Sequence, residues 1–219
     1  MLRSTNVICI YVCNNYAICA VLFCQTMFLT KHQLINLFLR DKMKSSKHIS
    51  LEKTIKYFCS HQLCIMRPSE ASFMCECVAK MEPGQQSLEI GRKYGGSMIL
   101  MCLANRRIKV YSLDINEDWR DLVKKIAKSY GVRRKQFKML TGDSRNHVWD
   151  RGPLHFILLD GWCIESDLSR YPQLLENGGV LMISGYHPWK KHVEKFAAEH
   201  PEFQFLKRVK NNIAFKKAA

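Results

Sequence analysis

Apolar positions follow two different periods along residues 87–215 of the chain. Five short apolar runs are typical of strands. They span residues 87–90, 108–113, 136–140, 155–159 and 180–183. Four segments between these runs place apolar residues at helical spacing. They span residues 97–104, 119–130, 164–175 and 189–199. Two further runs, at 203–206 and 213–215, flank Lys210-Asn211-Asn212 and predict a hairpin.

Alternation of strands and helices predicts a mainly parallel sheet with right-handed crossovers. The run at 155–159 is almost wholly apolar, as expected for a strand covered on both faces. With the C-terminal antiparallel hairpin, the pattern predicts an α/β, Rossmann-like fold. This fold has a seven-stranded, mostly parallel sheet with helices on both faces. Ligands of such sheets bind beyond the carboxyl ends of the strands.

The chain divides into three parts by composition. Residues 1–30 form an apolar segment, residues 31–68 a basic linker or helical region, and residues 69–219 the α/β domain. A helix is expected from Ser69 to about Met81, where Pro83-Gly84 stops it. The break before the domain falls near Arg67-Pro68.

The N-terminal segment contains no Lys, Arg, Asp or Glu from Ser4 to Thr30. It is long enough to cross a bilayer, which takes about 20 residues, although Asn14-Asn15 would be costly in hydrocarbon. Basic residues at 31–47 would keep the domain on the cytoplasmic side. The alternatives are a membrane anchor in contact through residues 4–30, a buried apolar helix, a cleaved secretory signal, and a start-site artefact.

The charge balance favours an anionic partner. The chain has 34 Lys and Arg against 19 Asp and Glu, a net charge of +15. Three basic clusters raise the question of nucleic acid. They are Arg106-Arg107-Lys109, Arg133-Arg134-Lys135-Lys138 and Lys207-Arg208-Lys210. Few aromatic residues lie among them, so a solvated basic surface is the simpler interpretation.

Ten cysteines occur without a C-x-x-C pair, and the chain has no N-x-S/T sequon. Both features favour a reducing compartment over secretion. One group could be considered for zinc. It comprises Cys59, His61, Cys64, Cys75 and Cys77. Its spacing matches no common zinc motif, so ordinary thiols are the preferred interpretation.

Three polar motifs follow predicted strands. The first, Glu89–Ser97, is a strand end, a glycine turn and a helix start, where bare backbone can approach a ligand. Asp114 follows the second strand, where an acid can accept hydrogen bonds from ribose, and Gly142-Asp143-Ser144 follows the third. Each has a structural alternative: a helix cap for Asp114, a tight turn for Gly95-Gly96, and a turn cap for Asp143.

Taken in order, these motifs resemble the class I S-adenosylmethionine-dependent methyltransferases. The similar branch, which includes small-molecule O-methyltransferases, reads roughly E-I-G-x-x-x-G-G-S, D, G-D-S, I-D-G-D-H and L-x-x-G-G. The matching segments here are Glu89–Ser97, Asp114, Gly142–Ser144, Leu159–Gly161 and Leu175–Gly179. The resemblance covers residues 70–217 and implies S-adenosylmethionine as the cofactor.

The resemblance also implies roles for individual residues. The glycine turn would hold the methionine part of the cofactor, Asp114 the ribose, and Asp143 with Ser144 the adenine edge. The cofactor-binding set is Glu89, Gly91, Tyr94, Gly95, Gly96, Ser97, Asp114, Asp143, Ser144 and Asp160.

Asp160 is also the residue where this family places an acid facing the substrate. The acid and histidine that follow D-G in the family are replaced by Trp162 and Cys163, and Ser184-Gly185 replaces the acid after the fifth strand. We therefore expect no metal. His187 is the best remaining candidate for a catalytic base, and Tyr186 with Trp162 could form walls of a substrate pocket.

The function expected from these features is methyl transfer to an oxygen or nitrogen of a small or modest-sized acceptor. Two alternatives stay open. One is a catalytically inactive, cofactor-binding scaffold with the same fold, and the other is an RNA methyltransferase. The sequence does not indicate the oligomeric state.

Overall fold

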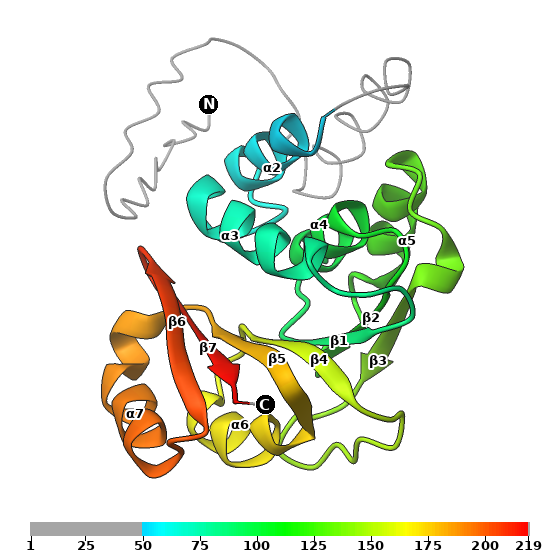
Figure 1. Cartoon of the computed structure of the whole chain (residues 1–219). Coiled ribbons are helices and arrows are strands. Elements are labelled where there is room, and N and C mark those ends of the chain that lie inside the picture. Colours follow the sequence, from blue (N-terminus) through cyan, green and yellow to red (C-terminus); the bar gives the residue numbers. More distant parts are fainter. Residues whose placement is uncertain (1–49, 219) are drawn as a thin grey trace, which may run out of the picture. The chain divides into compact units, whose positions relative to one another are not determined.

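The computed structural model describes residues 50–218 and contains one seven-stranded sheet (Figure 1). The strand order is β3-β2-β1-β4-β5-β7-β6. The first five strands are parallel, whereas β7 is antiparallel to both β5 and β6. The strands are β1 (Gln86–Ile90), β2 (Lys109–Asp114), β3 (Phe137–Thr141), β4 (Leu154–Leu159), β5 (Leu175–Ile183), β6 (Phe203–Val209) and β7 (Asn212–Lys217). The predicted fold and the C-terminal hairpin are confirmed.

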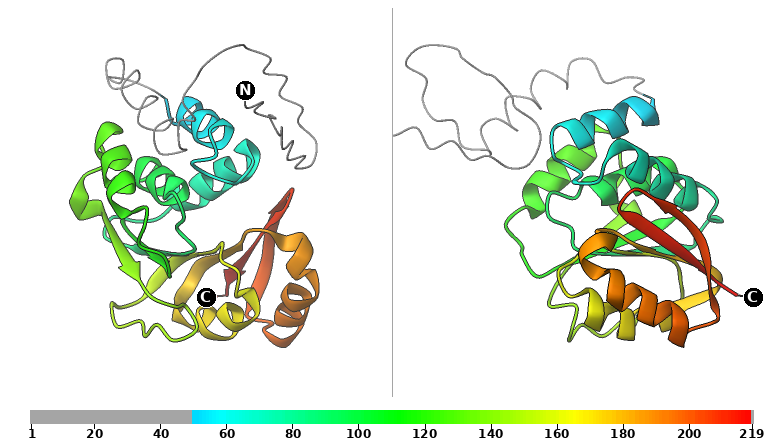
Figure 2. Two further views of the ribbon diagram at one scale, coloured as in Figure 1. Left: turned by 180° about the vertical axis from the view of Figure 1, so that it is seen from behind. Right: turned by 90° about the vertical axis from the view of Figure 1, so that its left-hand side faces the viewer.

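Helices cover both faces of the sheet (Figures 1 and 2). They are α2 (Leu51–Ser60), α3 (Pro68–Ala79), α4 (Gly96–Ala104), α5 (Arg120–Ser129), α6 (Ile164–Arg170) and α7 (Tyr186–Glu199). Helices α6 and α7 lie on one face, and α4 and α5 lie on the other. Short 3-10 turns span Arg134–Gln136 and Pro172–Leu174.

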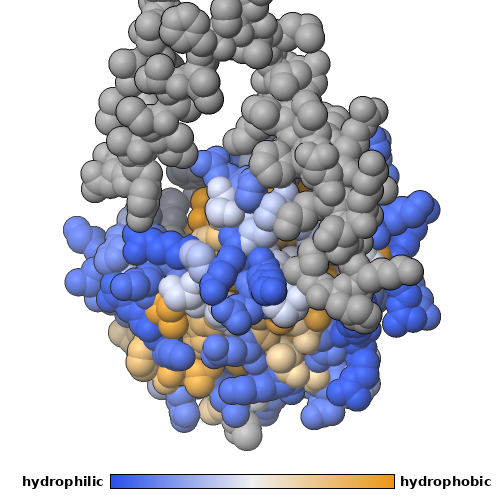
Figure 3. Space-filling view, turned by 90° about the horizontal axis from the view of Figure 1, so that it is seen from above, coloured by the Kyte–Doolittle hydropathy of each residue, from blue (hydrophilic) through white to orange (hydrophobic). Residues whose placement is uncertain are grey.

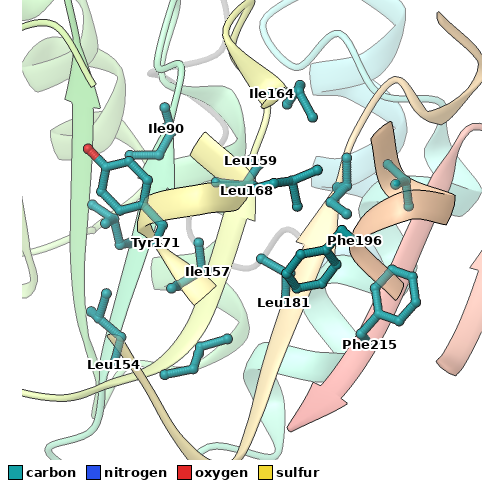
Figure 4. Packing of buried hydrophobic residues seen from close by; sticks show 14 of the residues in the cluster. Ile90, Leu154, Ile157, Leu159, Ile164, Leu168, Tyr171, Leu181, Phe196 and Phe215 are labelled. Carbon is teal, nitrogen blue, oxygen red and sulfur yellow. The ribbon is translucent and has the colours of Figure 1, made fainter. Parts of the chain in front are cut away.

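The core on the α6–α7 face is almost entirely aliphatic and aromatic (Figure 4). Alternate residues of the central strands, such as Ile157 and Leu181, meet Leu168 of α6 and Phe196 of α7 there. These four side chains are at most 5% exposed. This packing fixes the central strands and thereby the loops that leave their carboxyl ends.

Helix α2 lies within the region predicted as a basic linker or helix, and it packs against α3 and α4. Its residues Ile55 and Phe58 are buried. After α2 the chain passes close to the start of α4, where the carbonyl of Leu63 faces the Cα of Gly96 so closely that a Cβ would clash. Residues 51–66 therefore form part of the packing that supports the α4 N-terminus.

The predicted boundaries of α6 and β5 were wrong. The helix expected over 164–175 ends at Arg170, because Pro172 has no N–H to continue the helical hydrogen bonds beyond Tyr171. Strand β5 begins at Leu175 rather than at 180. Its pairing with β4 shifts between Leu154 and Phe156, so the first residues of β5 form an irregular extension.

Helix α7 begins at Tyr186, three residues before the predicted start at Trp189. The first two helical N–H groups find acceptors outside the helix. Tyr186 N donates to the carbonyl of Asn211 at 2.7 Å, and His187 N donates to Asn211 Oδ1 at 2.8 Å. Pro188 needs no acceptor in the first turn. His187, which precedes the helix predicted over 189–199, therefore lies in the first turn of α7.

Among residues 50–218, no helix is both long and apolar enough to span a bilayer. The apolar segment 4–30, with its predicted membrane contact, lies outside the described residues. Among residues 50–218, those on the face seen from above are mostly hydrophilic, and the hydrophobic ones gather toward one side (Figure 3).

Candidate cofactor and acceptor site

From β1 the chain adds β2 and β3 on one side, and then returns to place β4 on the other side of β1. Such a switch point opens a crevice at the carboxyl ends of the strands, where ligands of this fold class bind. The loops after β1 and β4 meet there, since the backbone N–H of Asp160 donates to the carbonyl of Ile90 at 2.9 Å. Gly91 N donates to the carbonyl of Leu113 at 2.9 Å. The turn after β1 is thus fixed from both neighbouring strands.

The glycines of this turn lie so close to other parts of the chain that a side chain would not fit. Gly91 has φ +94°, and an added Cβ would lie 2.5 Å from the backbone oxygen of Asp160. A Cβ on Gly95 would lie 2.6 Å from Cγ1 of Val123. Gly96 faces Leu63 in the same way. The bare Cα atoms therefore permit close packing of the turn against β4, α5 and the segment before α3.

Asp114, the last residue of β2, contacts the turn after β1. Its Oδ2 accepts the backbone N–H groups of Arg92 and Lys93, each at 2.8 Å. Its Oδ1 accepts the N–H of Asn116 at 2.8 Å. A carboxylate offers about four acceptor sites, so about one is left for a ligand hydroxyl. The carboxylate clamps the turn and keeps limited capacity for a sugar.

Arg92 is a structural residue that sequence reasoning missed. Its side chain is 2% exposed and donates to three carbonyls, those of Ser112 and Leu140 at 3.0 Å and of Asn116 at 2.9 Å. The guanidinium therefore joins the turn after β1 to the ends of β2 and β3. The sequence shows an arginine in a glycine turn but does not show which way its side chain points.

Glu89 lies below the turn and is fully buried. Its two carboxylate oxygens accept the hydroxyls of Ser97 in α4 and Ser112 in β2. Burial raises the pKa of Glu89 to about 8, and the two serine hydroxyls partly oppose this rise. Tyr94 is also buried and packs edge-on against Trp119, with ring centroids 4.8 Å apart. These residues support the turn from inside.

The loop after β3 carries Asp143 and Ser144. Asp143 forms an ion pair with Arg145, with Nη2 to Oδ2 at 2.5 Å. The carbonyl of Ser144 accepts the hydroxyl of Tyr171 at 2.8 Å. Below this loop lies Asp167 of α6, which the sequence analysis did not single out. Burial raises the pKa of Asp167, and the Ser144 hydroxyl opposes that rise.

Asp160 directly follows β4 and is largely enclosed by protein. Burial raises its pKa to about 6, while a hydrogen bond from Ser184 lowers it. The negative charge of Glu70 raises this pKa further, and the positive charge of Lys93 lowers it. The carboxyl is thus harder to ionise than an ordinary aspartate.

His187 is held by groups from the C-terminal hairpin. Arg208 of β6 donates from Nη2 to His187 Nε2 at 3.3 Å. A guanidinium has no acceptor, so His187 Nε2 must accept and Nδ1 carries the proton. The nitrogen that a base would use is therefore already engaged, and the lone pair of His187 faces Arg208.

Three exposed apolar residues lie in the connections that follow β2, β3 and β4. They are Ile115 after β2, Val148 beyond β3 and Trp162 after β4, with exposed fractions of 69%, 75% and 91%. Within residues 50–218, no three His, Cys, Asp or Glu side chains are grouped so as to hold a metal ion. Within the same residues, Cys59, Cys64, Cys75 and Cys77 form no disulfide.

Comparison with known proteins identifies the fold of this chain. No known family profile matches the sequence, and no curated protein matches it. Many solved structures match the fold. The chain has the fold of the class I S-adenosylmethionine-dependent methyltransferases. Low sequence identity in each case limits this likeness to the fold.

Three of these solved structures illustrate the degree of similarity. A Podospora anserina methyltransferase bound to S-adenosylhomocysteine has a TM-score of 0.61 and 16% identity, over 90% of this chain and all of its own. An O-methyltransferase of Thermotoga maritima has a TM-score of 0.61 and 14% identity, covering 78% and 72%. An rRNA methylase of Streptococcus thermophilus has a TM-score of 0.54 and 16% identity, covering 71% and 99%.

In this methyltransferase fold, two of the three basic clusters lie away from the candidate site. Arg106-Arg107 precede β2 and Arg133–Lys135 precede β3, so both lie at the amino ends of the strands. Lys207, Arg208 and Lys210 lie near the β6–β7 turn, at the edge where β4 and β5 end. Only this third cluster is placed to affect a ligand of the site.

Proposed function

We propose that the chain is an S-adenosylmethionine-dependent methyltransferase acting on an oxygen or nitrogen of a modest-sized acceptor. One observation carries the proposal: Asp114 and Asp160, from strands on either side of β1, converge on the turn beside Gly91. The clamp of Asp114 on this turn and the contact of Asp160 with Ile90 support one shared pocket. The fold neighbours with known cofactor chemistry are consistent with it.

The residues of the pocket fit the parts of this cofactor. The remaining acceptor site of Asp114 suits one ribose hydroxyl, and the exposed side chain of Ile115 offers an apolar surface for a purine. Asp143 and Ser144, in the partly exposed loop after β3, would meet the adenine edge. The backbone at Gly91 would lie against the methionine part, with Glu89, Tyr94, Gly95, Gly96 and Ser97 holding that backbone in place.

S-adenosylmethionine supplies an electrophilic methyl group on a sulfonium ion. The chain must then orient an acceptor in line with that methyl and remove a proton from a hydroxyl acceptor. Asp160, with its pKa near 6, would accept that proton at its carboxylate, and Ser184 would orient the carboxylate. His187 and Tyr186, at the start of α7, would contact the acceptor.

Calorimetry with S-adenosylmethionine and S-adenosylhomocysteine tests the proposal directly. Both ligands should bind the full chain, and Asp114→Asn should weaken both. Release of S-adenosylhomocysteine should then be measured with a panel of phenols, carboxylic acids and amines. Absence of cofactor binding would overturn the proposal. Binding without transfer to any acceptor class would favour the catalytically inactive scaffold.

A further inference from the structure

Arg208 is oriented by three contacts in the structure. Its Nε donates to the carbonyl of Lys210 at 3.1 Å, and its Nη2 donates to His187 Nε2 at 3.3 Å. Its guanidinium carbon lies 4.6 Å from the centre of the Tyr186 ring. A guanidinium has five N–H donors, so these contacts leave about three without use. The remaining donors are presented by a side chain whose orientation is already set.

No acid neutralises this guanidinium within the described part of the chain. The nearby carboxylate of Glu194 interacts with Lys190 and with the hydroxyl of Tyr186. Glu70 accepts the backbone N–H of Arg67 and of Asn211. The hydrogen bonds to the Lys210 carbonyl and the His187 ring orient the guanidinium of Arg208. Neither partner carries a negative charge, so the positive charge of the guanidinium is not neutralised. Such an arrangement suits an oxyanion, which arginine binds through two parallel N–H donors.

The position of Arg208 connects it with the candidate methyl-transfer site. Asn211 binds the backbone of both Tyr186 and His187, so the hairpin turn is docked on the start of α7. Two residues before Tyr186 lies Ser184, which hydrogen-bonds Asp160. The guanidinium therefore lies on the β5 side of Asp160, whereas Asp114 and Asp143 lie on the other side, after β2 and β3.

We propose that Arg208, oriented by Tyr186 and His187, binds a carboxylate or phosphate group of the methyl acceptor, which makes the acceptor a small anionic molecule. This rests on the proposed function, because it places an acceptor beside Asp160. Lys207 and Lys210 flank Arg208 and add attraction for an anion. His187 is then an acceptor-positioning residue, consistent with the use of its Nε2.

A small acceptor is favoured over RNA by the distribution of charge. A nucleic acid needs a basic track for successive phosphates, and base stacking on aromatic residues. The clusters at Arg106-Arg107 and Arg133–Lys135 are at the opposite edge of the sheet from Arg208. One guanidinium oriented by Tyr186 and His187 matches a single anionic group better than a chain of them.

Calorimetry on the full chain tests this assignment with phenyl phosphate, benzoate and the neutral benzamide as probes. Phenyl phosphate or benzoate should bind, and Arg208→Gln should weaken that binding by about tenfold or more, because a charge-assisted pair is lost. Benzamide should bind no better to the wild type than to the variant. Arg106→Gln removes the same charge at the far edge and should leave the binding of both anions unchanged.

The two anionic probes distinguish which group the acceptor carries. Tighter binding of phenyl phosphate indicates a phosphate, and tighter binding of benzoate indicates a carboxylate. Equal affinities in wild type and Arg208→Gln would overturn the inference, as would equal weakening by Arg106→Gln. So would a short single-stranded RNA that binds more tightly than either probe and depends on Arg208. S-adenosylhomocysteine should bind Arg208→Gln normally. If S-adenosylhomocysteine failed to bind the wild type, the proposed function would be overturned. The anion titrations test the role of Arg208 independently of that result.

Discussion

The carboxylate of Asp114 accepts the backbone N–H of Arg92 at 2.8 Å, across the turn between β1 and α4. This bond ties the end of β2 to the loop that leaves β1. The next N–H, that of Lys93, binds the same oxygen at 2.8 Å, and Lys93 has φ +44°. The acid therefore holds a turn that includes a non-glycine residue in a left-handed conformation.

Replacement of Asp114 should affect both stability and cofactor binding. Asp114→Ala removes the acceptor of three backbone N–H groups, so we expect a loss of about 1–3 kcal/mol in the free energy of unfolding. Affinity for S-adenosylhomocysteine should fall below detection by calorimetry, because the turn and the ribose acceptor are lost together. Asp118→Asn alters an exposed acid of the same loop and should change neither quantity. Normal affinity in Asp114→Ala would leave Asp114 a purely structural residue.

Gly91 and Gly84 allow the effect of close packing to be measured separately from the effect of backbone conformation. Gly91→Ala places a Cβ 2.5 Å from the backbone oxygen of Asp160 at φ +94°. Gly84 has φ +85° with nothing within 4 Å of a Cβ. Urea unfolding should show a loss of about 1–2 kcal/mol for Gly84→Ala. Gly91→Ala should lose about 1–3 kcal/mol more, because the added Cβ overpacks. Equal losses would mean that the loop after β4 moves away freely.

The placement of Asp114, Asp143 and Asp160 at one edge of the sheet could be predicted from the sequence, because each lies at or just after the end of a strand of a parallel sheet. The strands themselves were identified from apolar runs. What these residues bind could not be predicted in the same way. Asp114 uses most of its acceptor capacity on backbone N–H groups, which depend on the exact path of the turn.

The remaining discrepancies come from contacts between distant parts of the chain. Helix α7 starts early because Asn211, 24 positions beyond His187, accepts its first N–H groups. Arg208 was part of a basic cluster in the sequence, and its contact with Tyr186 appears only when β6 lies beside α7. Local periodicity contains no information on such pairs, so these features required the structure.

Buried Glu89 should give the protein a characteristic pH dependence. Its pKa is raised from 4.5 to about 8 in the folded state, so the folded protein binds more protons than the unfolded chain between these values. The contribution of Glu89 to stability is therefore fully present below pH 4.5 and is lost as pH rises toward 8. Each pH unit in that window should cost at most about 1.4 kcal/mol.

Glu89→Gln isolates this contribution, because glutamine keeps the shape and can still hydrogen-bond Ser97 and Ser112. Urea unfolding of both proteins at several pH values between 5 and 8 should show a steeper decline for the wild type. The variant should be relatively more stable at pH 8 than at pH 5. A constant difference across this range would mean that Glu89 does not titrate within it.

Asp160 should discriminate between the two forms of the cofactor in a pH-dependent way. S-adenosylmethionine carries a positive sulfonium charge that S-adenosylhomocysteine lacks, so an ionised carboxylate near the methyl group favours the former. Burial raises the pKa of Asp160 to about 6, and ionisation is therefore gained as pH rises through that value. We expect the ratio of the two affinities, measured by calorimetry, to shift toward S-adenosylmethionine between pH 5 and pH 7. Asp160→Asn should abolish the shift, and Asp150→Asn, an exposed acid beyond the candidate pocket, should retain it. A shift that persists in Asp160→Asn would assign it to another group and remove Asp160 from contact with the reacting centre.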